Sequence, residues 1–256
     1  MTFSFHRAIA GMLLLTSACD AGKGDGADTA VGCPSGHVVA SDTMYDSLQD
    51  ATESGAVEIV TVCSGTFEGG DFAGATGDLR IEGAGSAATQ FDGEGSGGSV
   101  LSANVSGALT LSGMTVTGGV SRTNADDAGG SAGGLSLGTS DARLSDLEIR
   151  DNAADWAAGL ALPSAPADGS RPEFAITDTR FVRNVAAWGG GAFSVNGPGT
   201  VTLVNVDLGA GADDNGPDDV AFFDGPPTPE AHEPLAVYQF DGVVSVTCVW
   251  ETRTCE

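Results

Sequence analysis

The sequence predicts an all-β chain coiled as a β-solenoid, because one short pattern recurs along it at regular intervals. The pattern is an apolar residue, two others, an apolar residue or threonine, one other, and an apolar residue. It occurs at residues 111–116, 144–149, 176–181 and 203–208. Successive copies begin 33, 32 and 27 residues apart. Such periods are typical of repeat folds in which neighbouring units bury one another's apolar faces.

Bend-forming residues stand at two fixed places in each copy. The position before the second patterned residue is occupied by Gly113, Asp146, Asp178 and Asn205 in turn. The position three residues after the third patterned residue is occupied by Gly119, Asn152, Asn184 and Gly211. Glycine, asparagine and aspartate are the residues that tolerate left-handed backbone torsions. Each unit is therefore expected to form a short strand, a bend, a second short strand and another bend.

A third strand is expected between the units, where small residues precede an apolar alternation at 133–137, 158–162 and 190–195. Stacked strands lie about 4.8 Å apart, so equivalent residues should form columns. One expected column brings Glu148, Arg180 and Asp207 together, and another pairs Asp151 with Arg183. Opposite charges on adjacent coils support this alignment, because like charges across a strand pair are destabilising.

These units resemble the right-handed parallel β-helix family of the pectin-lyase type. Residues 181–184 followed by 190–193 are similar to the FxxN and GGA(I/L/V) repeats of bacterial polymorphic outer-membrane proteins. Residues 149–152 with 158–160 form a degenerate copy. The resemblance covers roughly residues 45 to 223 and implies a right-handed parallel β-helix.

Both ends of the solenoid are expected to carry caps, which would keep the end strands from pairing with other chains. Residues 45–55 are predicted to form a short amphipathic helix before the first coil, and a proline-rich segment at 226–229 ends the regular part. Alternating residues around Asp241-Gly242 predict a C-terminal β-hairpin. The expected β-helix therefore spans 37–225, and the proline-rich linker with its disulfide-closed hairpin spans 226–256.

The N-terminus has the pattern of an export signal. Residues 1–18 combine a basic start, a short apolar core and small residues. Cys19 follows Ser17-Ala18, which resembles the signal of a bacterial lipoprotein in which this cysteine is lipidated. Thr16 stands where such signals normally carry leucine, so plain secretion remains the alternative. Residues 19–36 then comprise the lipidated cysteine and a flexible acidic tether. The expected location is the bacterial cell envelope, with the lipid in a membrane.

Cysteine parity agrees with export. If Cys19 carries lipid, four of the five cysteines remain, an even number for an oxidising compartment. Sequence proximity predicts the pairs Cys33–Cys63 and Cys248–Cys255. A metal site at these cysteines is disfavoured, because the chain contains no CxxC pair.

The strong negative charge argues against nucleic acid as a partner. The chain has 10 basic and 35 acidic residues and a formal net charge of −25. Phosphate contacts require a basic face. Such a surface is expected to be self-repelling and to attract cations, Ca²⁺ among them.

Acidic residues provide the candidates for chemistry. Asp146 and Asp178 would lie on adjacent coils and could act as an acid–base pair or hold Ca²⁺. The alternative is that both serve only as bend residues, as Gly113 does one coil earlier. A second acidic loop could bind Ca²⁺ or be simply solvated, since it lacks the spacing of an EF-hand. Its candidate ligands are Asp213, Asp214, Asp218 and Asp219.

Two tryptophans stand at equivalent places in successive units. Trp156 and Trp188 each follow a bend asparagine by four residues, so both indoles are expected at the same corner of adjacent coils. A buried ladder that shields the core is the structural interpretation. The functional alternative is a platform on which a sugar ring stacks.

Two functions from different classes are consistent with the sequence. The first is a non-catalytic, lipid-anchored interaction or structural module that contacts a cell-envelope glycan or a surface protein. The second is a polysaccharide-active enzyme, a lyase or a glycoside hydrolase. No cofactor is required by either, apart from a possible Ca²⁺ ion at the acidic loop. An enzyme of this kind would need carboxylates and a base that converge in a long groove.

Overall fold

The computed structural model describes the chain from Cys33 onward with seven gaps, and these residues belong to one compact unit, Val31–Glu256. The predicted signal, Cys19 and most of the predicted tether lie outside the described residues. Within them, no helix is long and apolar enough to cross a membrane. The described ranges are 33–53, 58–75, 77–95, 97–122, 132–139, 141–163, 171–224 and 233–256.

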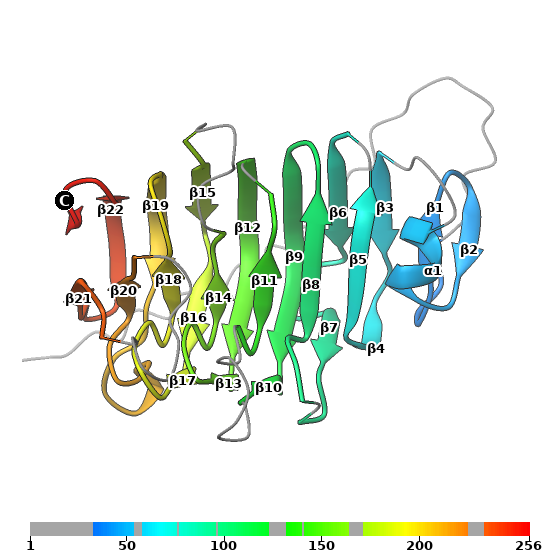
Figure 1. Ribbon diagram of the computed structural model, residues 1–256. Coiled ribbons are helices and arrows are strands. Elements are labelled where there is room, and N and C mark those ends of the chain that lie inside the picture. The colour runs from blue at the N-terminus through cyan, green and yellow to red at the C-terminus, as the bar shows by residue number, and fades with distance from the viewer. Residues whose placement is uncertain are drawn as a thin grey trace, which may run out of the picture. The chain divides into compact units, whose positions relative to one another are not determined.

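The predicted all-β fold is confirmed: the chain forms a right-handed parallel β-solenoid whose coils stack side by side (Figure 1). The largest sheet contains, in stacking order, β3 (Ile59–Val62), β6 (Leu79–Gly83), β9 (Leu109–Thr117), β12 (Asp141–Arg150), β15 (Glu173–Thr177) and β19 (Thr200–Asp207). Three short strands continue these coils after the first bend, namely β4 (Gly65–Glu68), β7 (Thr89–Asp92) and β16 (Arg180–Val182).

The third strands form a second parallel sheet on the opposite side of the core. It contains β5 (Gly70–Ala75), β8 (Leu101–Val105), β11 (Leu135–Leu137), β14 (Leu160–Ala161), β18 (Phe193–Val195) and β20 (Val220–Phe222). A small sheet of β10 (Val120–Ser121), β13 (Ala153–Ala154) and β17 (Val185–Ala186) completes the corner between them.

The strand register puts equivalent residues of the repeat in columns. Leu111 pairs with Leu144, Leu144 with Ile176, and Ile176 with Leu203. All four side chains are at most 2 % exposed. Every coil therefore contributes the same positions to one continuous apolar core, so each coil covers the core face of the next.

The first bend column has the left-handed backbone that the sequence predicted. The φ angles of Gly113, Asp146, Asp178 and Asn205 are 68°, 51°, 47° and 54°.

The second bend column differs from the expectation by one residue in three of the four units. There the left-handed torsions occur at Gly118, Asp151 and Arg183, one position before the expected residues, whereas Gly211 in the fourth unit has the expected positive φ, 60°. Asn152 and Asn184 follow these bends and point into the core, where they are at most 1 % exposed. Side-chain hydrogen bonding inside the coil, rather than tolerance of a left-handed torsion, accounts for asparagine at these two positions.

The N-terminal cap contains the predicted helix, α1 (Leu48–Glu53), which begins later than the expected start at Tyr45. The Ser47 hydroxyl accepts a hydrogen bond from the Asp50 amide at 3.1 Å, which caps the helix at its start. Leu48 and Ala51 face the core. A strand pair that was not expected from the sequence completes the cap. It consists of β1 (Val38–Ala40), antiparallel to β3, and β2 (Thr43–Tyr45).

The C-terminal cap is confirmed, but its strands pair differently from the expected hairpin. The two strands around Gly242 are β21 (Ala236–Tyr238) and β22 (Val243–Val249). They join different sheets, because β21 lies antiparallel to β20 and β22 lies antiparallel to β19. The hydrogen-bonded hairpin is formed instead by β22 and β23 (Thr254–Cys255). Both main sheets therefore continue past the last coil with an antiparallel strand.

Both predicted cysteine pairs are at disulfide distance. Cys33 and Cys63 are joined with an S–S distance of 2.00 Å, which ties the N-terminal arm to the end of β3. Cys248 and Cys255 are joined at 2.09 Å and lie directly opposite each other in the β22–β23 hairpin. Each disulfide therefore fastens one end of the described unit.

Candidate functional site

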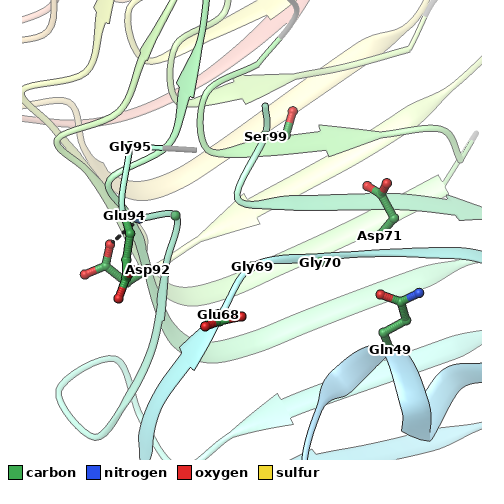
Figure 2. A pocket seen from close by; sticks show the side chains of 10 residues that line it. Gln49, Glu68, Gly69, Gly70, Asp71, Asp92, Glu94, Gly95 and Ser99 are labelled. Carbon is green, nitrogen blue, oxygen red and sulfur yellow. Dashed lines mark hydrogen bonds between the residues drawn. The ribbon is translucent and has the colours of Figure 1, made fainter. Parts of the chain in front are cut away.

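A wide cleft of about 640 Å³ opens beside the N-terminal cap (Figure 2). Its walls come from α1, from the turn between β4 and β5, and from the loop after β7. An adjoining hollow of about 310 Å³ extends the same groove along α1. The two spaces share four lining residues, Gln49, Glu68, Gly69 and Gly70.

Four carboxylates line the cleft, and no described lysine, arginine or histidine lines it. Asp92 and Glu94 lie together at one end, Asp71 lies at the other, and Glu68 lies between them (Figure 2). Glu68, Asp71 and Glu94 are exposed, and Asp92 is half-buried. The adjoining hollow adds Asp46. The potential in the cleft is therefore negative, and it favours a cationic ligand.

Strand register forces two of these acids close together. Glu68 and Asp92 are direct partners in the parallel pairing of β4 with β7. Like charges opposite each other in a sheet are destabilising. Asp92 Oδ1 accepts a hydrogen bond from the Glu94 amide at 2.9 Å, which fixes its orientation. Glu68 and Asp92 therefore lie side by side on adjacent coils without an ion-pair partner among the described residues.

The cleft exists partly because a core column ends in a glycine. Gly70 pairs with Leu101 in the second sheet, and Leu101 pairs with Leu135. Both leucines are buried, whereas Gly70 has no side chain to continue the column. A Cβ atom on Gly70 would meet only Gln49 Oε1 within 4 Å, at 3.9 Å. Phe67 and Leu48 lie beneath the adjoining hollow, where they are 7 % and 5 % exposed and belong to the core.

Among the described residues, Asp146 and Asp178 do not converge with a basic side chain. Both side chains are exposed on the outside of their bends. Asp178 accepts a hydrogen bond from Asn205 Nδ2 at 2.6 Å. This bond joins two neighbouring residues of the first bend column. Asp146 has a contact of 3.4 Å with the Ser86 hydroxyl. Neither carboxylate is ion-paired to a described arginine or histidine.

The acidic loop directs its four carboxylates to different partners. Asp213 pairs with Arg180 and Arg183, and Asp214 accepts a hydrogen bond from Gln239. Asp218 and Asp219 turn inward and are 9 % and 0 % exposed. Within the described ranges, no three histidine, cysteine or acidic side chains gather in a way that could hold a metal ion.

The predicted charge columns are formed at the corner beside this loop. Arg180 donates to Asp207 at 3.0 Å, and Arg183 donates to Asp151 at 2.7 Å and to Asp213 at 2.8 Å. The Arg183 guanidinium holds the pKa of Asp151 below its usual range. These exposed pairs align neighbouring coils and each contributes roughly 0–1 kcal/mol.

The two tryptophans share one apolar cluster at the corner, as their equal offsets predicted. Trp156 is 5 % exposed, and its ring packs edge-on against Phe223 with centroids 6.2 Å apart. Trp188 is half-buried and packs against the same cluster. The burial of Trp156 agrees with the structural interpretation for this residue, since a ring enclosed by protein has no free face for a pyranose. The half-buried Trp188 leaves the sugar-platform hypothesis open at that position.

A buried asparagine ladder is the main feature that was not expected from the sequence. Asn152, Asn184 and Asn215 lie on successive coils, and their side-chain amides are joined from one coil to the next. Asn152 Nδ2 donates to Asn184 Oδ1, and Asn184 Nδ2 donates to Asn215 Oδ1, both at 3.0 Å. Asn215 was missed because the 3₁₀ turn Gly211–Asp213 lengthens that coil, so the expected position fell on Gly211.

The cleft acids were also missed, although the sequence carries a signal for them. On two adjacent coils, a buried phenylalanine is followed by an acidic residue that points outward. The two pairs are Phe67-Glu68 and Phe91-Asp92.

Comparison with known proteins finds no matching family, no matching curated protein and no matching solved structure. The basis for inferring the function of this chain is therefore its own residues.

Proposed function

We propose that this protein is an exported, lipid-anchored, non-catalytic binding module of the bacterial cell envelope, and that its acidic cleft receives a basic segment of a partner surface protein. The observation that carries the proposal is the lining of the cleft, in which four carboxylates face no positive charge from the described residues. A lysine or arginine side chain suits this geometry. Its charged end would lie among Glu68, Asp92 and Glu94, and its aliphatic stem would lie in the adjoining hollow along α1.

Several features support a binding role. The coil-to-coil pairing and the two cysteine pairs make a rigid support, which limits the entropy lost when a partner binds. Paired cysteines suit an oxidising, exported location. Cys19 is the proposed lipid attachment site, and the segment that follows it is the proposed tether. The polysaccharide-active alternative has no comparable support, because neither Asp146 nor Asp178 is matched with a described basic partner.

The binding experiment uses the purified exported chain and calorimetric titration with a lysine- and arginine-rich peptide. The test variant is Glu68→Gln with Glu94→Gln, because both side chains are exposed and removing their charge spares the fold. We expect about tenfold weaker binding, from roughly 1–2 kcal/mol of lost attraction, and weaker binding at high salt. The matched control, Glu58→Gln with Glu173→Gln, changes the net charge equally at exposed positions outside the cleft.

Equal loss of affinity in the control and test variants would show that only the net charge matters and would refute the cleft assignment. Failure of the parent chain to bind the basic peptide would refute the proposed ligand. The proposed lipid attachment at Cys19 is tested separately by the variant Cys19→Ala. This variant should move the mature chain from the membrane fraction to the soluble fraction, and an unchanged distribution would refute lipid attachment at Cys19.

A further inference from the structure

We propose that the buried pair Asp218–Asp219 is a proton-operated latch that holds the C-terminal cap on the last coil. The cap is the segment 233–256, which contains β21, β22 and β23. This inference is independent of the proposed function.

Asp219 is bonded to the cap through both its side chain and its backbone. Its Oδ2 accepts a hydrogen bond from the Phe240 amide at 2.7 Å, and its own amide donates to the Tyr238 carbonyl at 3.0 Å. These contacts lie at the end of β21, just before the chain crosses from one sheet to the other. Phe240 is therefore held at the crossing point by one fully buried carboxylate.

Asp218 anchors the other side of the pair to the solenoid. Its Oδ1 accepts a hydrogen bond from the Gly190 amide at 2.7 Å. A Cβ atom on Gly189 would approach Asp218 Oδ2 to 3.4 Å, and both glycines have positive φ angles. The glycine pair thus leaves room for the carboxylate at this corner. The latch connects the coil of β17 and β18 to the cap.

The asparagine ladder ends on this latch. Asn215 Nδ2 donates to Asp219 Oδ1 at 3.1 Å, and Asn215 Oδ1 accepts from Asn184 Nδ2. All the side-chain amides of the ladder therefore donate in the same direction, toward Asp219. Aligned hydrogen bonds polarise one another, so the ladder partly supports a negative charge on this carboxylate.

The remaining ionisable groups near the latch give the charge no compensation. Asp214 and Asp218 add like charge from the same loop. On the cap side, the Tyr238 hydroxyl donates to the Arg253 carbonyl, and Asp241 is acidic. On the solenoid side, the nearby arginines are ion-paired with the three carboxylates Asp151, Asp207 and Asp213. No described lysine or arginine pairs with Asp219.

These surroundings set the direction of the pH effect. Burial, the largest cause, raises the pKa of Asp219 to about 7, and burial also raises the pKa of Asp218. Both carboxyls therefore bind protons more tightly in the closed state than in an opened, solvated state. Stability of the closed cap is fully present below the ordinary aspartate pKa of 3.8 and is lost as the pH rises from there through about 7.

The test is amide hydrogen exchange of residues 236–240 in the full exported chain, measured at pH 5 and pH 8 and corrected for intrinsic exchange rates. We expect the opening equilibrium of this segment to rise roughly 10- to 100-fold between the two pH values. Exchange in β9 and β12, far from the cap, should show no such change. Equal protection of 236–240 at both pH values, or greater opening at pH 5, would overturn the proposal.

Two variants separate the latch from general acid effects. Asp219→Asn replaces the carboxyl by a group that does not titrate, so the pH dependence of cap opening should largely disappear. Asp214→Asn removes a nearby charge outside the latch and should retain it. If Asp219→Asn fails to fold, a carboxyl-carbon NMR titration of the parent chain decides the question. A normal aspartate titration for every carboxyl in the 213–219 loop would overturn the latch.

Discussion

Replacing Asn184 by alanine gives the most direct test of what holds the coils in register. Asn184 is fully buried in the middle of the asparagine ladder. Its Oδ1 accepts from the Asn152 amide at 3.3 Å and from Asn152 Nδ2 at 3.0 Å. Its Nδ2 donates to the Ile149 carbonyl at 2.9 Å and to Asn215 Oδ1 at 3.0 Å. The substitution therefore removes four hydrogen bonds and links in both directions along the solenoid.

The expected cost follows from the groups left behind. The backbone N–H of Asn152 and the backbone carbonyl of Ile149 lose the Asn184 side chain as their hydrogen-bond partner. Both groups lie where Asn152 and Asn184 are at most 1 % exposed to water. A buried polar group without its partner costs about 1–3 kcal/mol. With the small cavity added, Asn184→Ala should lower the free energy of unfolding by about 3–5 kcal/mol. For a unit of this size, about 2–4 °C per kcal/mol corresponds to a fall in Tm of roughly 10 °C.

Differential scanning calorimetry of the oxidised chain measures this shift. Asn104→Ala is the matched control, because Asn104 is an exposed asparagine on β8. It should change the stability by less than about 0.5 kcal/mol. If the Tm of Asn184→Ala stayed within about 2–3 °C of the parent value, roughly the shift expected from 1 kcal/mol, the ladder would not contribute to stability as argued.

Two further substitutions test the bend column and the tryptophan cluster. Asp178→Val should lower the free energy of unfolding by about 1–2 kcal/mol, because a β-branched residue is strained at a φ of 47°. Asp178→Asn and Asp178→Gly should be tolerated. Equal denaturant midpoints for the valine and asparagine variants would contradict this reasoning. Trp156→Ala should cost about 3–5 kcal/mol because the ring is buried against Phe223, and a normal urea midpoint would show that the corner is not part of the core.

The sequence alone determined the coil and its columns, because repetition is a local and one-dimensional signal. Gly113, Asp146, Asp178 and Asn205 share one torsion, and residue type predicts that torsion without knowledge of any neighbour. Cysteine parity and proximity likewise predicted both cysteine pairs. The capping helix was predicted from its own amphipathic pattern, although α1, described over Leu48–Glu53, begins later than the expected start at Tyr45.

Only the tertiary structure decided which side chains meet across coils. The length of the loop between Leu208 and Asn215 determines that Asn215, and not Gly211, continues the ladder. Asp219 looked like one acid in a solvated loop, yet packing of the cap makes it fully buried and raises its pKa. The strands around Gly242 separate onto two sheets because both β19 and β20 present an edge that the cap can pair. Such outcomes depend on loop length and burial, which are properties of the assembled coil and not of any short segment.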